Sequence, residues 1–132
     1  MRFLSIYKTA ETGVPPTRDH MEAMQKLIEE GRKAGWLLAT EGCLPSALGA
    51  RVRSSAGSVV VTDGPFVETK EIIGGFALLE AASKDEAIRL TRAFLAVAGD
   101  GECELRQIFT PADGAGDCAD THRELAEQFA RQ

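Results

Sequence analysis

The chain has 132 residues and carries 15 Lys and Arg against 20 Asp and Glu, a net charge of −5. This length fits one domain with a two-layer core. The acidic balance disfavours nucleic acid or an anionic membrane surface as the main partner, which leaves small molecules or proteins. An odd number of cysteines without paired Cys/His spacing argues against a disulfide framework and a structural zinc site. No run approaches the length of a membrane span, and we expect a cytoplasmic protein without a metal or other cofactor.

The first third of the chain predicts a strand followed by a helix. Residues 2–8 alternate so that apolar side chains fall on both faces of the strand. A helix follows with Thr17 or Asp19 as its N-cap, and Asp19 is spaced from Glu22 as in a capping box. Gly35 is expected to end this helix, because glycine favours the left-handed conformation found there.

The middle of the chain predicts short strands. Residues 36–39 form an extended segment, and the turn signal around Gly57 predicts a hairpin between residues 48–54 and 58–62. Residues 72–80 read as a longer, more apolar strand. We expect the strand at 58–62 to pair antiparallel with this longer strand.

The last third predicts a helix, a strand and a tail. Ser83 has a capping-box partner three residues later, and Gly99 ends the helix that Ser83 begins. A last core strand is expected over residues 103–110. Residues 111–117 read as a linker, and residues 119–131 as a helix whose narrow apolar stripe could pack on the domain or on a second subunit.

This order of elements predicts an α+β fold, a ferredoxin-like split βαβ sheet with two helices on one face. The other face of the sheet also carries apolar residues and must be covered. A homodimer that packs sheet against sheet is the simplest solution.

Residues 63–71, with the sequence DGPFVETKE, are the most informative segment. Asp63, Gly64 and Pro65 form a turn, in which Gly64 tolerates a positive φ and Pro65 fixes its own φ. A charged loop held between strands is a common location for binding residues. The alternative is a solvated loop capped by a structural aspartate.

This segment, together with the strand that contains Gly74-Gly75, resembles the DGPF branch of the YCII-related family. The likeness extends over residues 1–110 and divides the chain into that domain and a linker with a C-terminal helix at 111–132. It implies a dimeric α+β barrel, hence a homodimer. Within the strand, the two glycines indicate a bulge or a close backbone approach and not a dinucleotide fingerprint.

The resemblance also implies a catalytic pair, His20 and Asp63. His20 is expected in the first turn of the first helix, where the helix dipole favours the neutral imidazole that can act as a base. A nearby Asp63 would orient the ring. Alternatively, His20 is a helix-start residue with one edge in solvent.

Four further residues are candidates for binding the substrate. Glu68 and Lys70 could hold opposite ends of a polar ligand, or pair with each other. Arg106 could bind a carboxylate, although Glu104 would satisfy it without a ligand. Phe66 could stack on a ligand, or anchor the turn in the core.

Two classes of function remain. The first is a small enzyme that binds a small polar or aromatic molecule near the DGPF turn and uses His20 and Asp63 for proton transfer, with lyase, isomerase or dehalogenase chemistry conceivable for this family. The second is a noncatalytic binding or regulatory protein, since family members are associated in bacterial genomes with extracytoplasmic-function sigma factors.

Overall fold

The computed structural model describes residues 1–109 and 118–131. Six strands, three α-helices and a short 3₁₀ helix make up this part of the chain. In chain order they are β1 (Arg2–Thr9), α1 (Arg18–Ala34), β2 (Leu37–Gly42), η1 (Ser46–Leu48), β3 (Ala50–Ser55), β4 (Ser58–Asp63), β5 (Ile72–Glu80), α2 (Lys84–Ala98), β6 (Glu102–Gln107) and α3 (Cys118–Ala130).

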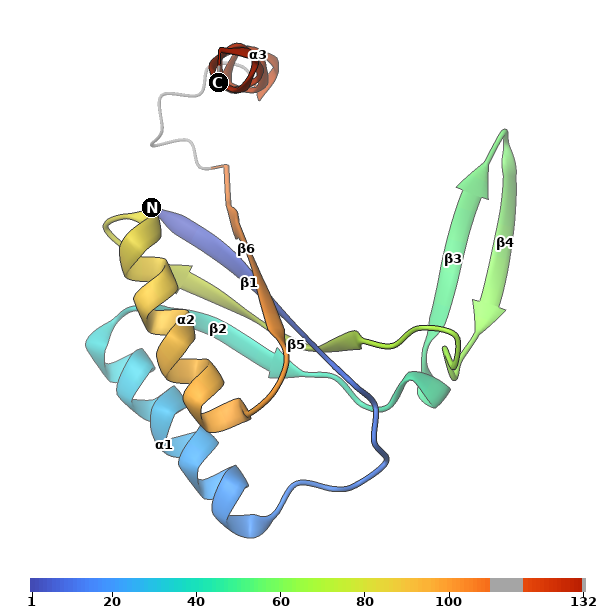
Figure 1. Cartoon of the computed structure of the whole chain (residues 1–132), viewed down its shortest axis with the longest axis vertical. Coiled ribbons are helices and arrows are strands. Elements are labelled where there is room, and N and C mark those ends of the chain that lie inside the picture. Colours follow the sequence, from blue (N-terminus) through green and yellow to red (C-terminus); the bar gives the residue numbers. More distant parts are fainter. Residues whose placement is uncertain (110–117, 132) are drawn as a thin grey trace.

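Four of the strands form one antiparallel sheet in the order β2-β5-β1-β6. Both α1 and α2 lie on the same face of this sheet (Figure 1). The predicted ferredoxin-like α+β fold is therefore confirmed. Within one chain the sheet is open, with β2 and β6 as its edges.

The core lies between the sheet and the two helices. Its buried apolar side chains come from β1, β2, β5, the turn after β5, and α2: Phe3, Leu37, Leu79, Ala81, Ala87 and Leu90. Side chains alternate across a strand, so the neighbours of Phe3 and Leu79 in sequence point to the other face. That face has no covering element among the described residues.

Local capping explains where the helices begin and end. The hydroxyl of Thr17 accepts a hydrogen bond from the backbone N–H of His20 at 3.2 Å, so Thr17, and not Asp19, is the N-cap of α1. Gly35 ends α1 in the left-handed conformation with φ 85°, as predicted. The N-cap of α2 is Ser83, whose hydroxyl accepts a hydrogen bond from the backbone N–H of Glu86 at 3.1 Å. This confirms the start that was predicted for the second helix.

Strands β3 and β4 pair with each other and form a separate two-stranded hairpin. Its two-residue turn has positive φ at both Ala56 (49°) and Gly57 (82°), the pattern that suits the twist of a tight hairpin. The predicted pairing of β4 with β5 is wrong. Both edges of β5 are already occupied, by β1 and β2, so β4 has no edge to join. The hairpin stands on the side of the sheet away from the helices (Figure 1).

The C-terminal segment contains the predicted helix, now bounded as α3. The side chains of Leu125 and Phe129 on its apolar stripe are exposed. The predicted linker at 111–117 and the last residue of the predicted strand at 103–110 lie outside the described residues, and within them β6 ends at Gln107. No helix in the described part of the chain is long and apolar enough to cross a membrane.

Candidate functional site

A cavity of about 700 Å³ lies between the sheet and the two helices of the domain. Side chains from β1, α1, β2, β5 and α2 line it. Its volume falls within the range of sites that enclose small molecules.

The cavity exists because β5 changes from large to small residues along its length. Leu79 packs in the core and borders the cavity at one end of the strand, whereas Gly74 and Gly75 present no side chain at the other. The register shifts opposite Tyr7, so that Gly74 is an extra residue in β5. This confirms the predicted bulge. A Cβ on Gly75 would lie 2.7 Å from the carbonyl oxygen of Glu41, so the close backbone approach is also present.

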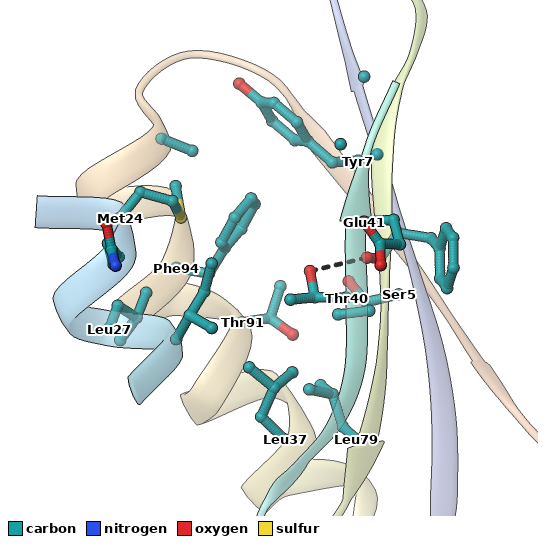
Figure 2. A pocket seen from close by; sticks show the side chains of 18 of the residues that line it. Ser5, Tyr7, Met24, Leu27, Leu37, Thr40, Glu41, Leu79, Thr91 and Phe94 are labelled. Carbon is teal, nitrogen blue, oxygen red and sulfur yellow. Dashed lines mark hydrogen bonds between the residues drawn. The ribbon is translucent and has the colours of Figure 1, made fainter. Parts of the chain in front are cut away.

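The walls of the cavity are mainly apolar. Figure 2 shows Met24 and Leu27 on α1 and Phe94 on α2 across from Tyr7 and Thr40 on the strands. The rings of Tyr7 and Phe94 meet edge to face, with centroids 5.3 Å apart and planes at 83°. Such a lining suits the flat apolar body of an aromatic ligand.

Most hydroxyl groups in the walls already donate within the chain. Tyr7 donates to the carbonyl of Asp100 at 2.9 Å, and Thr91 donates to a carbonyl one turn earlier in α2 at 2.8 Å. Thr40 donates to the carbonyl of Phe76 at 2.9 Å. These hydroxyls therefore retain acceptor capacity but no free proton for a ligand.

His20 lines this cavity, at the third position of α1. It is half-buried, and its backbone N–H is held by the cap at Thr17. Within the described residues its imidazole forms no hydrogen bond or ion pair. The ring is therefore available for a contact with a bound molecule, and the proton-transfer role of His20 stays a prediction.

The DGPF loop does not line this cavity. Asp63 ends β4 with an exposed side chain, and no hydrogen bond or ion pair within the described residues joins it to His20. Phe66 packs under the guanidinium of Arg51, 4.0 Å from the ring centroid. Glu68 accepts from Arg51 at 3.1 Å. The structure thus brings Phe66 and Glu68 together through an arginine that the sequence did not single out.

The other two predicted binding residues lie elsewhere. Lys70 is exposed and follows Glu68 in the same loop, but Glu68 is paired with Arg51. Arg106 pairs with Glu104 at 3.5 Å, and Glu104 also accepts from Lys8 at 3.2 Å. Lys8, and then Arg106, hold the pKa of Glu104 below its ordinary value. The alternative partner weighed for Arg106 is thus present, and a ligand role for it stays a prediction.

A cluster around Ser46 fixes the DGPF loop, and we call it the Glu11–Ser46 latch. The Glu11 carboxylate accepts from the backbone N–H and from the hydroxyl of Ser46, each at 2.6 Å. The Ser46 hydroxyl oxygen also accepts from the N–H of Phe66 at 3.2 Å. These donors hold the pKa of Glu11 below its ordinary value, the Ser46 hydroxyl contributing most. The sequence did not predict this latch, because a single carboxylate in the loop between β1 and α1 does not indicate its partner.

Gly64 is required for space and not for its backbone angle. Gly64 is not among the glycines with positive φ, so its turn does not use the conformational freedom that glycine offers. A Cβ at Gly64 would overlap the carbonyl oxygen of Ser46, and the Gly64 N–H donates to the carbonyl of Gly49 at 2.9 Å. The close contact with the latch thus excludes any side chain.

No group of His, Cys, Asp and Glu side chains in the described residues could hold a metal ion. Cys43 is exposed and Cys103 is half-buried. Burial raises the pKa of Cys103, which favours the inert thiol over the thiolate.

The fold and the cavity define a ferredoxin-like α+β protein with a site of small-molecule size. Residues 1–110 match the YCII-related domain, and the chain belongs to the YCII-related family. It is similar to an uncharacterized protein, R00369, from Rhizobium meliloti (strain 1021), with 40% identity over 75 residues. That alignment spans 57% of this chain and 57% of the relative.

A solved structure shares the fold. It is 5-chloro-2-hydroxyhydroquinone dehydrochlorinase (TftG) from Burkholderia phenoliruptrix AC1100, in complex with 2,5-dihydroxybenzoquinone. The superposition gives a TM-score of 0.51 with 17% identity and covers 83% of this chain and 94% of that one. The likeness supports the architecture, and the family prediction made from the sequence is confirmed.

Proposed function

We propose that this protein binds a small aromatic molecule in the cavity between sheet and helices, with His20 as the group that exchanges a proton with it. The observation that carries the proposal is the placement of an unbonded imidazole in the wall of an otherwise mainly apolar cavity of about 700 Å³. The apolar walls would hold the ring of the ligand, and His20 would accept a proton from one of its hydroxyl groups.

The shared fold supports an aromatic ligand with hydroxyl groups. TftG is a dehydrochlorinase, and its solved structure is a complex with a dihydroxybenzoquinone. A hydroxylated ring would suit this cavity as well, because the wall hydroxyls offer acceptor lone pairs to ligand hydroxyls. Dehalogenase-like chemistry is therefore the first reaction to test, ahead of lyase and isomerase chemistry.

The predicted His20–Asp63 pair is not needed for this proposal. Asp63 lies at the base of the hairpin and does not line the cavity of its own chain. His20 alone can act as a base if the ligand brings the hydroxyl within hydrogen-bond reach. The orienting role of Asp63, and the binding roles of Phe66, Glu68, Lys70 and Arg106, stay predictions.

The test uses 2,5-dihydroxybenzoquinone as a ligand and 5-chloro-2-hydroxyhydroquinone as a substrate. Ligand binding is measured by calorimetry and turnover by chloride release, for wild type, His20→Gln and Arg18→Ala. Arg18 is the control, because it lies in the same helical turn, has an exposed side chain and does not line the cavity. We expect all three proteins to bind and only His20→Gln to lose turnover. The absence of any binding would refute an aromatic ligand of this class.

The second function, noncatalytic binding, is favoured by the internal hydrogen bonds of Tyr7, Thr40 and Thr91 and by the separation of Asp63 from the cavity. Equal binding by wild type and His20→Gln without turnover would support this function instead. Association with an extracytoplasmic-function sigma factor belongs to the same alternative. A pull-down with such a factor would test that association.

We further propose a homodimer that covers the open face of the sheet. Leu4, Ile6, Phe76 and Leu78 lie on that face, in register on β1 and β5, and Phe76 is exposed. An apolar sheet face without a covering layer favours association. Two such sheets packed face to face would form the α+β barrel that the family resemblance implies.

A further inference from the structure

The β3–β4 hairpin has one apolar face and one polar face. Its register places Val52 opposite Val61, and Ser54 opposite Val59, so these side chains share a face. Arg51 and Arg53 lie on the other face. Every residue of both strands is exposed.

The apolar face is unusual in how little it is covered. The exposed fractions are 68% for Val52, 64% for Val59 and 59% for Val61. An isolated two-stranded hairpin is at best marginally stable in water, and three or more strands or a packed layer are usually required. The hairpin therefore lacks the layer that its sequence is suited to pack against.

The hairpin is nevertheless held in place at its base. The Gly64 N–H donates to the carbonyl of Gly49 at 2.9 Å, which joins the two chain segments that flank the hairpin. The Glu11–Ser46 latch ties the same point to the loop after β1. The hairpin is thus directed away from the helices, on the same side as the open sheet face (Figure 1).

We propose that the hairpin is an arm that packs its valine face on a second copy of this chain. The inference rests on the homodimer proposed above and adds a second contact surface to it. In a two-fold dimer each surface of one copy meets a surface of the other, and each contact occurs twice. A chain that carries two uncovered apolar surfaces on one side supplies what such an interface needs.

The size of the surfaces supports this partner. A stable interface takes roughly 20 to 30 residues from each side. The valine face of the hairpin is too small to reach that size alone. The open sheet face, which includes Leu4, Ile6, Phe76 and Leu78, adds to it, so that the two surfaces together supply the apolar centre of a larger interface.

The polar face of the hairpin can remain in solvent when the valine face is buried, as an arm with one buried side requires. Arg51 is already engaged, with Glu68 at 3.1 Å and with Thr69 at 3.1 Å. Arg53 lies on this same face of the exposed hairpin. Charged residues on a short exposed ribbon also disfavour open-ended strand pairing, which suits a closed dimer.

The experiment compares two neighbouring valines of β4 by sedimentation equilibrium of the full chain. Val61→Lys places a charge on the apolar face, whereas Val60→Lys places the same charge on the polar face. The two side chains have the same exposed fraction of 59%, which makes Val60 a matched control. We expect a dimeric wild type, a dissociation constant at least about tenfold higher for Val61→Lys, and less than about a twofold change for Val60→Lys.

A second variant on the same face, Val52→Lys, should weaken the dimer as Val61→Lys does, and circular dichroism verifies that each variant is folded. Equal dimerisation of the Val60 and Val61 variants would overturn the arm. A dimer broken by Phe76→Lys but unaffected by Val61→Lys would also overturn it, while leaving the sheet-to-sheet dimer intact. A wild type that is monomeric at every concentration would overturn both the arm and the sheet-to-sheet homodimer. The valine face would then pack against another protein or against α3. Ligand binding, measured on the three valine variants, tests the cavity separately, because none of these valines lines it.

Discussion

Substituting Gly64 by alanine would separate the DGPF loop from its latch. The new Cβ would overlap the carbonyl oxygen of Ser46. Ser46 cannot move aside without losing its bonds to Glu11 and its bond from the Phe66 N–H. Apart from the bonds to Glu11, the displaced loop loses two neutral hydrogen bonds, the one from Phe66 and the one from residue 64 to Gly49. At about 1 kcal/mol each, these amount to about 2 kcal/mol of local opening free energy.

The assay is amide hydrogen exchange. Opening that is easier by about 2 kcal/mol accelerates exchange roughly 30-fold at the Phe66 and Ser46 amides, while amides of the central strand β1 keep their protection. Gly49→Ala is the matched control. Its Cβ would lie 3.5 Å from the same Ser46 oxygen, an ordinary contact, and its φ of −109° suits any residue. If the two variants exchange alike, the reasoning about space is wrong.

Three further predictions concern single residues. Thr17→Ala removes the cap over His20 and should lower the free energy of unfolding by about 1 kcal/mol in urea titrations; an unchanged midpoint would contradict the cap. Gly31→Ala gains about 1 kcal/mol of helix propensity. Its Cβ would nevertheless lie 2.7 Å from the Trp36 ring, so we expect a net loss of about 1 kcal/mol, and a stabilised variant would refute the clash. Because the folded pKa of Glu11 is lowered, its stabilising contribution is present above about pH 4.3 and is lost as the pH falls through the folded pKa. Glu11→Gln should remove this dependence in exchange measurements from acid to neutral pH, and an identical pH profile would refute it.

The sheet and helices could be predicted because their signals are local. Thr17 and Ser83 each cap a helix through a residue three positions later, and Gly35 ends α1 through its own backbone. The pairing of β4 with β5 failed for a non-local reason. The two edges of β5 are taken by β1 and β2. The residues of the turn near Asp63 carry no information about this pairing.

The candidate site could be predicted only in part, for the same reason. His20 reaches the cavity because its place on α1 is set by the cap at Thr17. The position of Asp63 is set by the hairpin, whose direction depends on a contact between Glu11 and Ser46, 35 residues apart. The sequence predicts which strand or helix contains each residue. It does not predict the direction of the hairpin, because that direction depends on a contact between residues far apart in the chain.

One strand, β5, contributes to both the core and the cavity. Leu79 packs in the buried core with Phe3 and also borders the cavity, whereas Gly74 and Gly75 border it without a side chain. Because a core residue stabilises by filling space and a cavity requires unfilled space, the two demands conflict at any one position. In β5, Leu79 fills space in the core at one end of the strand, and the two glycines leave space unfilled at the other. Gly64 also leaves space unfilled, because the absence of its side chain lets the DGPF loop approach the Glu11–Ser46 latch. The glycines of residues 64–75 therefore act mainly through the volume that they leave free.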